Sequence, residues 1–305
     1  MILRVIIILM FYWAALGRGI SDLSTTSVFT YDPASKEFGF SIINYVTAKG
    51  ITFTSANPVT VLSNTSIQRV IGSIILNDSG HMKNISMPAL LSVTGNVDGA
   101  TTANFVTNVY FPNLLAVNGS MIIFDATAIH TWDTHSLQYV GADFQGSQIG
   151  DVAVLDFGQL TNVVGPFSIG ETVALKSLNL SNLVTCPFIQ FGDHPNLTNI
   201  NLASYIGGAS QGNNQTMNDV TLTNFTLPSL KLWSGNVKCD NCAFSAASVN
   251  QLLHVFVTVT NETGALWGPG GWAMNLSGGT SAAPTGQGIT DKNTLVARGA
   301  AITTN

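Results

Sequence analysis

Charged residues are scarce in this chain of 305 amino acids. Asp, Glu, Lys and Arg together make up 9% of it, against about 25% in an average soluble domain. A coiled coil or a helical bundle is excluded, because their outer helix faces need Glu, Lys and Arg. The 11 Lys and Arg residues are too few and too scattered to neutralise a phosphate backbone, so we expect no nucleic-acid partner.

Apolar residues are not scarce, since they make up 46% of the chain. This content excludes an intrinsically disordered protein. Ser, Thr, Asn and Gly take the place of the missing charges, and the length suits one elongated domain or two compact ones. The composition therefore predicts a β-rich surface protein with an uncharged polar exterior.

Cysteine is rare as well, with three residues in the chain. Cys239 and Cys242 form a lone CxxC motif, and Cys186 stands apart. A zinc site would need a second pair or well-spaced histidines, and a thioredoxin-like site would need a βαβ setting. We therefore expect a local disulfide or two small buried thiols, and the pairing of the three cysteines stays open.

The first 19 residues have the pattern of a secretory signal. Arg4 precedes the apolar run 5–16 (VIIILMFYWAAL), and small residues at Gly17 and Gly19 predict cleavage after Gly19. The run is shorter than the roughly 20 residues that span a bilayer. A buried N-terminal strand or an uncleaved anchor is the alternative. No later segment is long and apolar enough to predict a transmembrane helix after signal removal.

The middle of the chain repeats with a period of about 23 residues. In the first frame a leucine is followed three residues later by Val or a similar residue, often with Gly. Its lead residues are Leu90, Leu114, Leu137, Leu160, Leu183 and Leu230, with steps of 24, 23, 23, 23 and 47 residues. A second frame runs in phase with it, at Leu155-Asp-Phe157, Leu178-Asn-Leu180, Ile200-Asn-Leu202 and Thr221-Leu222.

Two frames with one period predict a solenoid in which each turn stacks on the last. Short alternating apolar triplets predict parallel strands with inward side chains, and the Gly, Asn and Pro between them predict corners. The predicted fold class is mainly β: a parallel β-solenoid of ~23-residue turns over 61–240 with a small α/β C-terminal cap over 241–305. A β-sandwich with accidental spacing is the alternative.

The Pro-x-Leu-x-x-Val-x-Gly frame, as in 112–119, resembles leucine-rich repeats of the irregular, receptor-L-domain or bacterial surface type. The resemblance covers about 60–305, and the fixed Asn of the plant or ribonuclease-inhibitor consensus is absent. The stretch 275–288 with the ending 302–305 resembles the terminal module of leucine-rich-repeat-like proteins from bacteria, phages and environmental sequences. By analogy, the resemblance implies recognition at a surface.

The two ends of the predicted solenoid differ from its middle. Val249, Leu252, Leu253 and Phe256 have helical spacing, with Ser245 as a candidate N-cap. We also predict a strand over 272–276, a short helix over 290–299 and a last strand over 300–303, which together cap the open end. Residues 20–60 do not follow the period and are interpreted as an N-terminal cap or an attachment segment.

Several motifs that suggest catalysis lack their context. The GxSxG match at 208–212 is followed by polar residues without a helical pattern, so it makes no nucleophile elbow. Residues 279–284 resemble a subtilisin serine motif but are one residue short, and no His-Gly-Thr motif lies near Asp78. We therefore predict no catalytic residues.

Metal binding has weak support in the sequence. His130, Asp133 and His135 need a turn between them to share a metal, because 130 and 135 face opposite sides of a strand. Acidic corners of stacked turns are candidate Ca²⁺ ligands, although no Gly-Gly-x-Gly-x-Asp repeat occurs. These acids are Asp98, Asp125, Asp133, Asp143, Asp151, Asp156 and Glu171. We expect no cofactor, with Ca²⁺ as the alternative.

Candidate ligand-binding residues are aromatic, because an exposed ring can stack on a sugar. They are Trp132, Trp233, Trp267 and Trp272, for which core packing is the other interpretation. Asn-x-Ser/Thr sequons are candidates for N-glycosylation of a secreted protein, although they exclude no bacterial or viral source. Their asparagines are Asn64, Asn77, Asn84, Asn118, Asn179, Asn196, Asn214, Asn224, Asn261 and Asn275.

Together these patterns predict a secreted or cell-surface binding and adhesion protein. Its solenoid face would recognise a glycan, a cell-wall polymer or another protein without catalysis. A structural or virion component, such as a tail fibre, is the first alternative. A carbohydrate-active β-helix enzyme is the second, but it needs clustered carboxylates, and Asp156 is the one acid placed in either frame.

Overall fold

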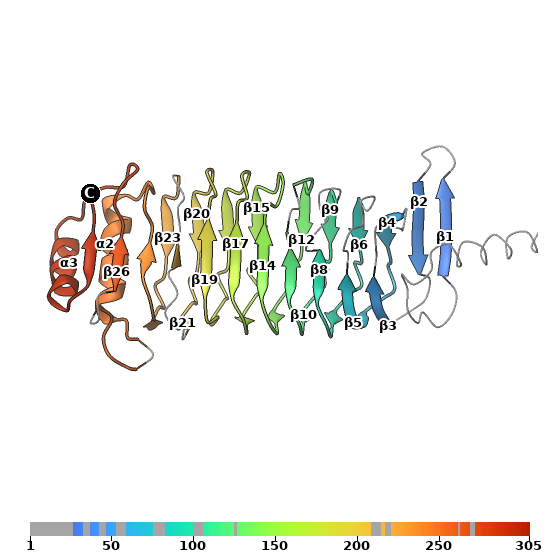
Figure 1. Cartoon of the computed structure of the whole chain (residues 1–305), viewed down its shortest axis with the longest axis horizontal. Helices are drawn as coiled ribbons and strands as arrows, with labels where there is room; N and C mark the ends of the chain where they lie inside the picture. The colour runs from blue at the N-terminus through green and yellow to red at the C-terminus, as the bar shows by residue number, and fades with distance from the viewer. Residues whose placement is uncertain are drawn as a thin grey trace, which may run out of the picture.

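The chain folds into an elongated parallel β-solenoid with two helices near its C-terminal end (Figure 1). The computed structural model describes residues 27–32, 37–42, 47–52, 59–75, 83–99, 106–124, 127–208, 215–216, 221–261, 263–268 and 272–305. About six regular turns of about 23 residues form the body, which confirms the predicted fold class. The predicted signal at 1–19 lies outside the described residues.

Each regular turn contributes three short strands, and the equivalent strands of successive turns form three parallel rows. The first row places a buried valine in each of four consecutive turns, because Val93, Val117, Val140 and Val163 are aligned by register. Its strands are β7 (Ser92–Val93), β10 (Ala116–Val117), β13 (Tyr139–Val140) and β16 (Asn162–Val163), with β21 (Gly207–Gly208) and β24 (Leu232–Trp233) pairing further along the chain.

The second row carries the larger core side chains. Its strands are β8 (Val97–Gly99), β11 (Met121–Ile123), β14 (Phe144–Ser147), β17 (Phe167–Gly170) and β19 (Ile189–Gly192). The Phe144 and Phe167 rings stack at 4.7 Å between centroids, and Phe157 meets both edge-on. Such contacts add about 0.5–1.5 kcal/mol per pair beyond burial. One longer strand, β5 (Arg69–Ile75), heads both the first and second rows.

The third row lies along one long edge of the molecule in Figure 1. Its strands form two ladders that follow one another along the axis, with no strand pairing between β12 and β15. The first ladder includes β4 (Val59–Ser63), β6 (Asn84–Ser86), β9 (Asn108–Tyr110) and β12 (Thr131–Asp133), and the second is β15 (Val154–Asp156), β18 (Ser177–Asn179), β20 (Asn199–Asn201) and β23 (Asn224–Thr226). In each strand from β15 to β23 the middle residue is buried, and both of its neighbours face outward. This alternation produces one apolar side and one polar side.

Two positions of the repeat differ from the sequence prediction. Tyr205, which is 1% exposed, occupies the turn that the first frame skips between Leu183 and Leu230. In the second frame, the residue paired with Ile200 is Phe225 and not Leu222. The sequence prediction therefore placed the last member of this frame three residues too early. Leu222 is also buried, at a corner of the coil.

Strands also lie before the regular turns. β1 (Ser27–Asp32) and β2 (Glu37–Ile42) pair antiparallel. β2 then pairs in parallel with β4, and β3 (Thr47–Thr52) pairs in parallel with β5. The parallel rows therefore already include β3, inside the segment interpreted as a cap or an attachment unit.

The C-terminal end has the predicted elements. Helix α2 (Ala246–Thr258) buries Val249, Leu252, Leu253 and Phe256, and Ser245 is its N-cap. Helix α3 (Gln287–Ala297) packs against α2, and a final sheet of β22 (Gln215–Thr216), β25 (Val237–Lys238), β26 (Ala273–Asn275) and β27 (Ala301–Thr303) continues the coil. Across the described residues, no helix is long and apolar enough to cross a membrane.

Candidate functional site

The outward side of the third row is a long polar surface, which we call the polar face. It consists of the two outward residues in each of the seven strands β6, β9, β12, β15, β18, β20 and β23. These residues are Asn84 and Ser86, Asn108 and Tyr110, Thr131 and Asp133, Val154 and Asp156, Ser177 and Asn179, Asn199 and Asn201, and Asn224 and Thr226. Eleven of the fourteen are uncharged polar residues, which places hydrogen-bonding groups at regular intervals along the solenoid axis.

Amide side chains on the polar face bond from one turn to the next. Asn108 Nδ2 donates to Asn84 Oδ1, and Asn108 Oδ1 accepts from the Thr131 hydroxyl. Further along, Asn224 Nδ2 donates to Asn199 Oδ1 at 2.7 Å. Because these amide side chains are held by their neighbours, this part of the polar face is preorganised.

The last residue of several of these strands also forms the following turn. Asp156 Oδ1 accepts from the Gly158 backbone N–H at 2.9 Å, and Asn179 Oδ1 accepts from that of Ser181 at 3.2 Å. Asn201 and Ala203 repeat the arrangement. These are Asx-turns, in which a short polar side chain replaces a backbone partner. An Asn followed two residues later by Ser thus has a structural role in this coil.

A shallow hollow of about 290 Å³ lies at the end of strands β15 and β18. It is lined by His135, Asp156, Gly158, Gln159, Asn179, Ser181 and Asn182. His135 Nδ1 lies 2.6 Å from Asp133 Oδ1, and Asn179 Nδ2 donates to Asp156 Oδ1 at 2.8 Å. The hollow therefore lies across the ends of β15 and β18, is lined by one carboxylate, one imidazole and several amides, and has the Asp133 carboxylate bonded to its imidazole.

Tyr110 is a feature of the polar face that the sequence interpretation missed. Its side chain is 43% exposed, and it pairs in register with Asp133 on the next strand. In the sequence it sits beside the buried Phe111 at the start of a repeat, so only the strict in-and-out alternation of the strand marks it as outward.

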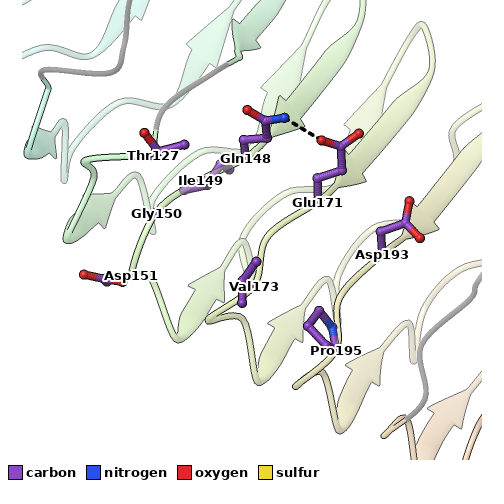
Figure 2. Close-up of a pocket in the computed structure, with 9 residues that line it drawn as sticks. All are labelled: Thr127, Gln148, Ile149, Gly150, Asp151, Glu171, Val173, Asp193 and Pro195. Atoms are coloured by element: carbon purple, nitrogen blue, oxygen red, sulfur yellow. Dashed lines mark hydrogen bonds between the residues drawn. The ribbon is translucent and has the colours of Figure 1, made fainter.

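A second depression, the corner groove, crosses the turns that follow β14, β17 and β19 (Figure 2). Its volume is about 580 Å³, and Ile149, Val173 and Pro195 provide its apolar lining. The other lining residues are Thr127, Gln148, Gly150, Asp151, Glu171 and Asp193. Figure 2 shows Gln148, Glu171 and Asp193 at equivalent corners of successive turns, and all three have left-handed backbones with φ between 52° and 62°.

The corner groove contains carboxylates but has no metal-ligand geometry. Gln148 Nε2 donates to Glu171 Oε2 at 2.6 Å, and Asp151 pairs with His130 at 3.0 Å. In the part of the chain that the structure describes, no three His, Cys, Asp or Glu residues are grouped so that they could hold an ion. The expected Ca²⁺ alternative therefore gains no support from Asp98, Asp133, Asp143, Asp151, Asp156 or Glu171, and Asp125 lies outside the described residues.

His130 and His135 bind different acids, so the structure does not bring them together on one ligand. His130 Nδ1 pairs with Asp151 of the next turn, while His135 Nδ1 pairs with Asp133 of its own strand. A shared metal at 130–135 is therefore not supported.

The four tryptophans do not form an exposed platform. Trp267 is fully buried, and its Nε1 donates to the Gly235 carbonyl at 3.1 Å. Trp233 is 2% exposed and meets Phe256 edge-on. Trp132 and Trp272 are partly buried and pack against the core. The sugar-stacking interpretation does not fit Trp233 and Trp267, because turn stacking and the cap enclose both rings.

The cysteines and the serine motif also have structural roles. Cys186, Cys239 and Cys242 are all buried. Ser281, in the subtilisin-like stretch, is 5% exposed; its hydroxyl donates to the Cys242 carbonyl and accepts from the Phe244 N–H. It therefore links the segment before α2 to the segment before α3 within the C-terminal cap. Ser210 of the GxSxG match lies outside the described residues.

The sequon asparagines occupy very different environments. Asn64 is 1% exposed, and its Oδ1 accepts from the Ser66 and Ile67 N–H groups. Asn84, Asn179 and Asn224 belong to the polar face, and Asn261 and Asn275 form Asx-turns. Asn118 and Asn196 are exposed at corners. Asn77 and Asn214 lie outside the described residues. Glycosylation itself stays a prediction.

Comparison with known proteins gives one distant relative. The chain is 27% identical to the protein ecm33 of Aspergillus fumigatus over an alignment of 212 residues that covers 66% of the chain. The aligned part is 48% of that protein, so the chain spans about half the length of this curated relative. No family model matches the chain. No solved structure matches it either.

Proposed function

We propose that this protein is a secreted or cell-surface, leucine-rich-repeat-like binding protein. It recognises a glycan, a cell-wall polymer or another protein through the polar face. The observation that carries the proposal is the polar face itself, in which seven strands hold outward, mainly uncharged hydrogen-bonding side chains on a rigid coil. A stacked coil lets such positions vary without harming the core.

The similarity to ecm33 supports a location at the cell surface or in the cell wall. The predicted signal at 1–19 agrees with that location. A protein expressed with its leader should then be secreted with Ile20 at its N-terminus, which N-terminal sequencing of the secreted form would check. Retention of residues 1–19 in the secreted protein would contradict the signal prediction.

We also propose that the polar face binds without catalysis. Asp156 is held by the Gly158 N–H and by Asn179, while Asp133 is held by His135. Both acids thus have structural partners. In the test, residues 20–305 are incubated at micromolar concentration with insoluble polysaccharides and with cell-surface extracts. Retention supports the binding proposal, and retention of nothing contradicts it. Release of soluble sugars that is lost in Asp156→Asn would overturn the non-catalytic proposal.

A further inference from the structure

Tyr110 is the exposed aromatic ring of the polar face, and it stands at one end of a continuous line of polar groups. Its register partner is Asp133, which holds His135 at 2.6 Å. His135 lines the same hollow as Asp156 and Asn179 of the next two turns. Asn182 closes the hollow, with its amide bonded to the Gly158 carbonyl at 2.6 Å. We call Tyr110, Asp133, His135, Asp156, Asn179 and Asn182 the polar track.

The polar track has unused hydrogen-bonding capacity as well as a ring. Asp133 and Asp156 each use one carboxylate oxygen for structural bonds, and no hydrogen bond reaches the other oxygen from a described residue. His135 bonds to Asp133 through Nδ1, and no described residue bonds to its Nε2. Fixed carboxylates accept strong bonds from hydroxyls, and a tyrosine ring packs on an apolar face.

The charge of the polar track selects among polymers. It contains two carboxylates, no lysine and no arginine. An anionic polymer would be repelled at this surface, whereas a neutral polyhydroxylated chain would not. The track follows the solenoid axis over four consecutive turns, from Tyr110 on β9 to Asn179 on β18, which suits an extended ligand; β9 pairs with β12 and β15 with β18, and the hollow shared by His135 and Asp156 connects the two pairs.

From this arrangement we infer that the polar track is a binding site for a neutral polysaccharide chain lying along the solenoid axis. The Tyr110 ring stacks on a sugar face, while Asp133 and Asp156 accept hydrogen bonds from hydroxyls and the amide N–H groups donate. The inference rests on the proposed function and names the ligand class of the same surface.

The experiment measures binding of residues 20–305 to a panel of neutral, anionic and amino polysaccharides. Four variants are compared with the wild type: Tyr110→Ala, Tyr110→Phe, Asp156→Asn and Gln190→Ala. We expect about tenfold weaker binding to a neutral polysaccharide for Tyr110→Ala and little change for Tyr110→Phe, which keeps the ring. Asp156→Asn keeps the oxygen that accepts from Gly158, so the turn persists while the acceptor loses its charge, and binding weakens about fivefold.

Gln190→Ala is the matched control, because Gln190 is an exposed polar residue on the second row. It leaves the affinity unchanged if the polar track is the site. If a neutral polysaccharide binds and neither Tyr110→Ala nor Asp156→Asn weakens that binding, the polar track is not the site, while the proposed function stands. If the protein prefers an anionic polysaccharide, or retains only proteins from cell-surface extracts, the inference that the ligand is a neutral polysaccharide is wrong. Binding to nothing contradicts both proposals. Circular dichroism of each variant verifies that the fold is retained.

Discussion

Cys186 shows how one buried residue ties the stability of the coil to pH. Its thiol lies within 3.9 Å of the Tyr205 hydroxyl, and that hydroxyl donates to the Cys186 carbonyl at 3.1 Å. Burial raises the pKa of the thiol from 9.0 to about 12, and burial also raises the pKa of Tyr205 well above 10.0. Both groups are therefore neutral in the native protein at pH 8.

We expect stability to fall as the pH rises above about 9. The unfolded chain releases the Cys186 proton near its ordinary pKa of 9.0, while the folded chain holds it to about 12. The contribution is complete below pH 9 and is lost as the pH approaches 12. Urea unfolding at pH 8 and pH 10.5 measures the change, and Cys186→Ala should reduce this dependence. An equal pH dependence in both proteins would contradict the assignment.

His194 is a second buried polar residue on which the coil depends. It is fully buried; its Nδ1 accepts from the Thr172 N–H at 3.2 Å, and its Nε2 lies 3.1 Å from the Ile169 carbonyl. With Nδ1 accepting from the Thr172 N–H, Nε2–H is the group that donates to the Ile169 carbonyl. The ring thus satisfies backbone groups of the preceding turn.

His194→Ala should lower the free energy of unfolding by about 3 kcal/mol, because it leaves two backbone groups without partners and opens a cavity. His130→Ala is the control, since its contact with Asp151 is exposed to solvent and contributes at most about 1 kcal/mol. Chemical denaturation of both variants provides the comparison. Equal losses would show that burial of His194 has no special role.

Among the elements, helix α2 illustrates how far sequence patterns reach. The spacing of Val249, Leu252, Leu253 and Phe256 predicted the helix and its buried side, and Ser245 was predicted as the N-cap. The Ser245 hydroxyl accepts from the Ser248 N–H at 3.1 Å, which confirms the cap. Helix α3 begins at Gln287, three residues before the predicted start, after Gly286 with φ 48°.

Ser245→Ala should destabilise the protein by about 1 kcal/mol, because the first turn of α2 loses its side-chain acceptor. Ser245→Asp keeps an acceptor at the same position and should restore most of the loss. Thermal unfolding of the three proteins distinguishes capping from a general effect of substitution. If the Asp variant unfolds like the Ala variant, capping is not the cause.

The rows of strands were predicted unevenly, for physical reasons. Leu155, Leu178 and Ile200 share one inward position, so the third row shows in the sequence as an apolar frame. The second row changes from Gly146 to Ile169 at one of its two inward positions, which makes its apolar frame less regular. Packing of Ile149 into the space above Gly146 explains how the coil accepts a missing side chain.

The candidate site was less predictable than the fold. Tryptophan is a reasonable sign of sugar binding, but whether a ring is exposed depends on how turns and cap stack, as Trp233 and Trp267 show. Tyr110 needed the exact strand register to be recognised as outward. Many sequons, such as that at Asn179, also follow from the Asx-turns of the coil.

At the scale of the whole molecule, stability depends on contacts between turns. The Phe167 ring touches Phe144 of the preceding turn, at 4.7 Å, and Phe191 of the following turn, at 6.0 Å between centroids. Both contacts are buried. A defect here acts on three turns at once, because each turn of a solenoid is stabilised by its neighbours.

Phe167→Ala should therefore cost about 3–5 kcal/mol of unfolding free energy. Ser168→Ala is the matched control, because Ser168 faces outward on the same strand and should change stability by less than about 0.5 kcal/mol. Guanidinium unfolding followed by circular dichroism measures both. Loss of a single turn, without a shift of the main transition, would contradict cooperative stacking.

Because the turns have nearly constant length, the length of the molecule is set by the number of turns. Each added 23-residue coil lengthens it by one strand spacing, about 4.8 Å, and presents one more pair of outward side chains. Related proteins can thus become longer or shorter by whole turns while each remaining valine still packs against the valine of the next turn. An insertion or deletion of one residue inside a strand would instead turn its apolar side chains toward water.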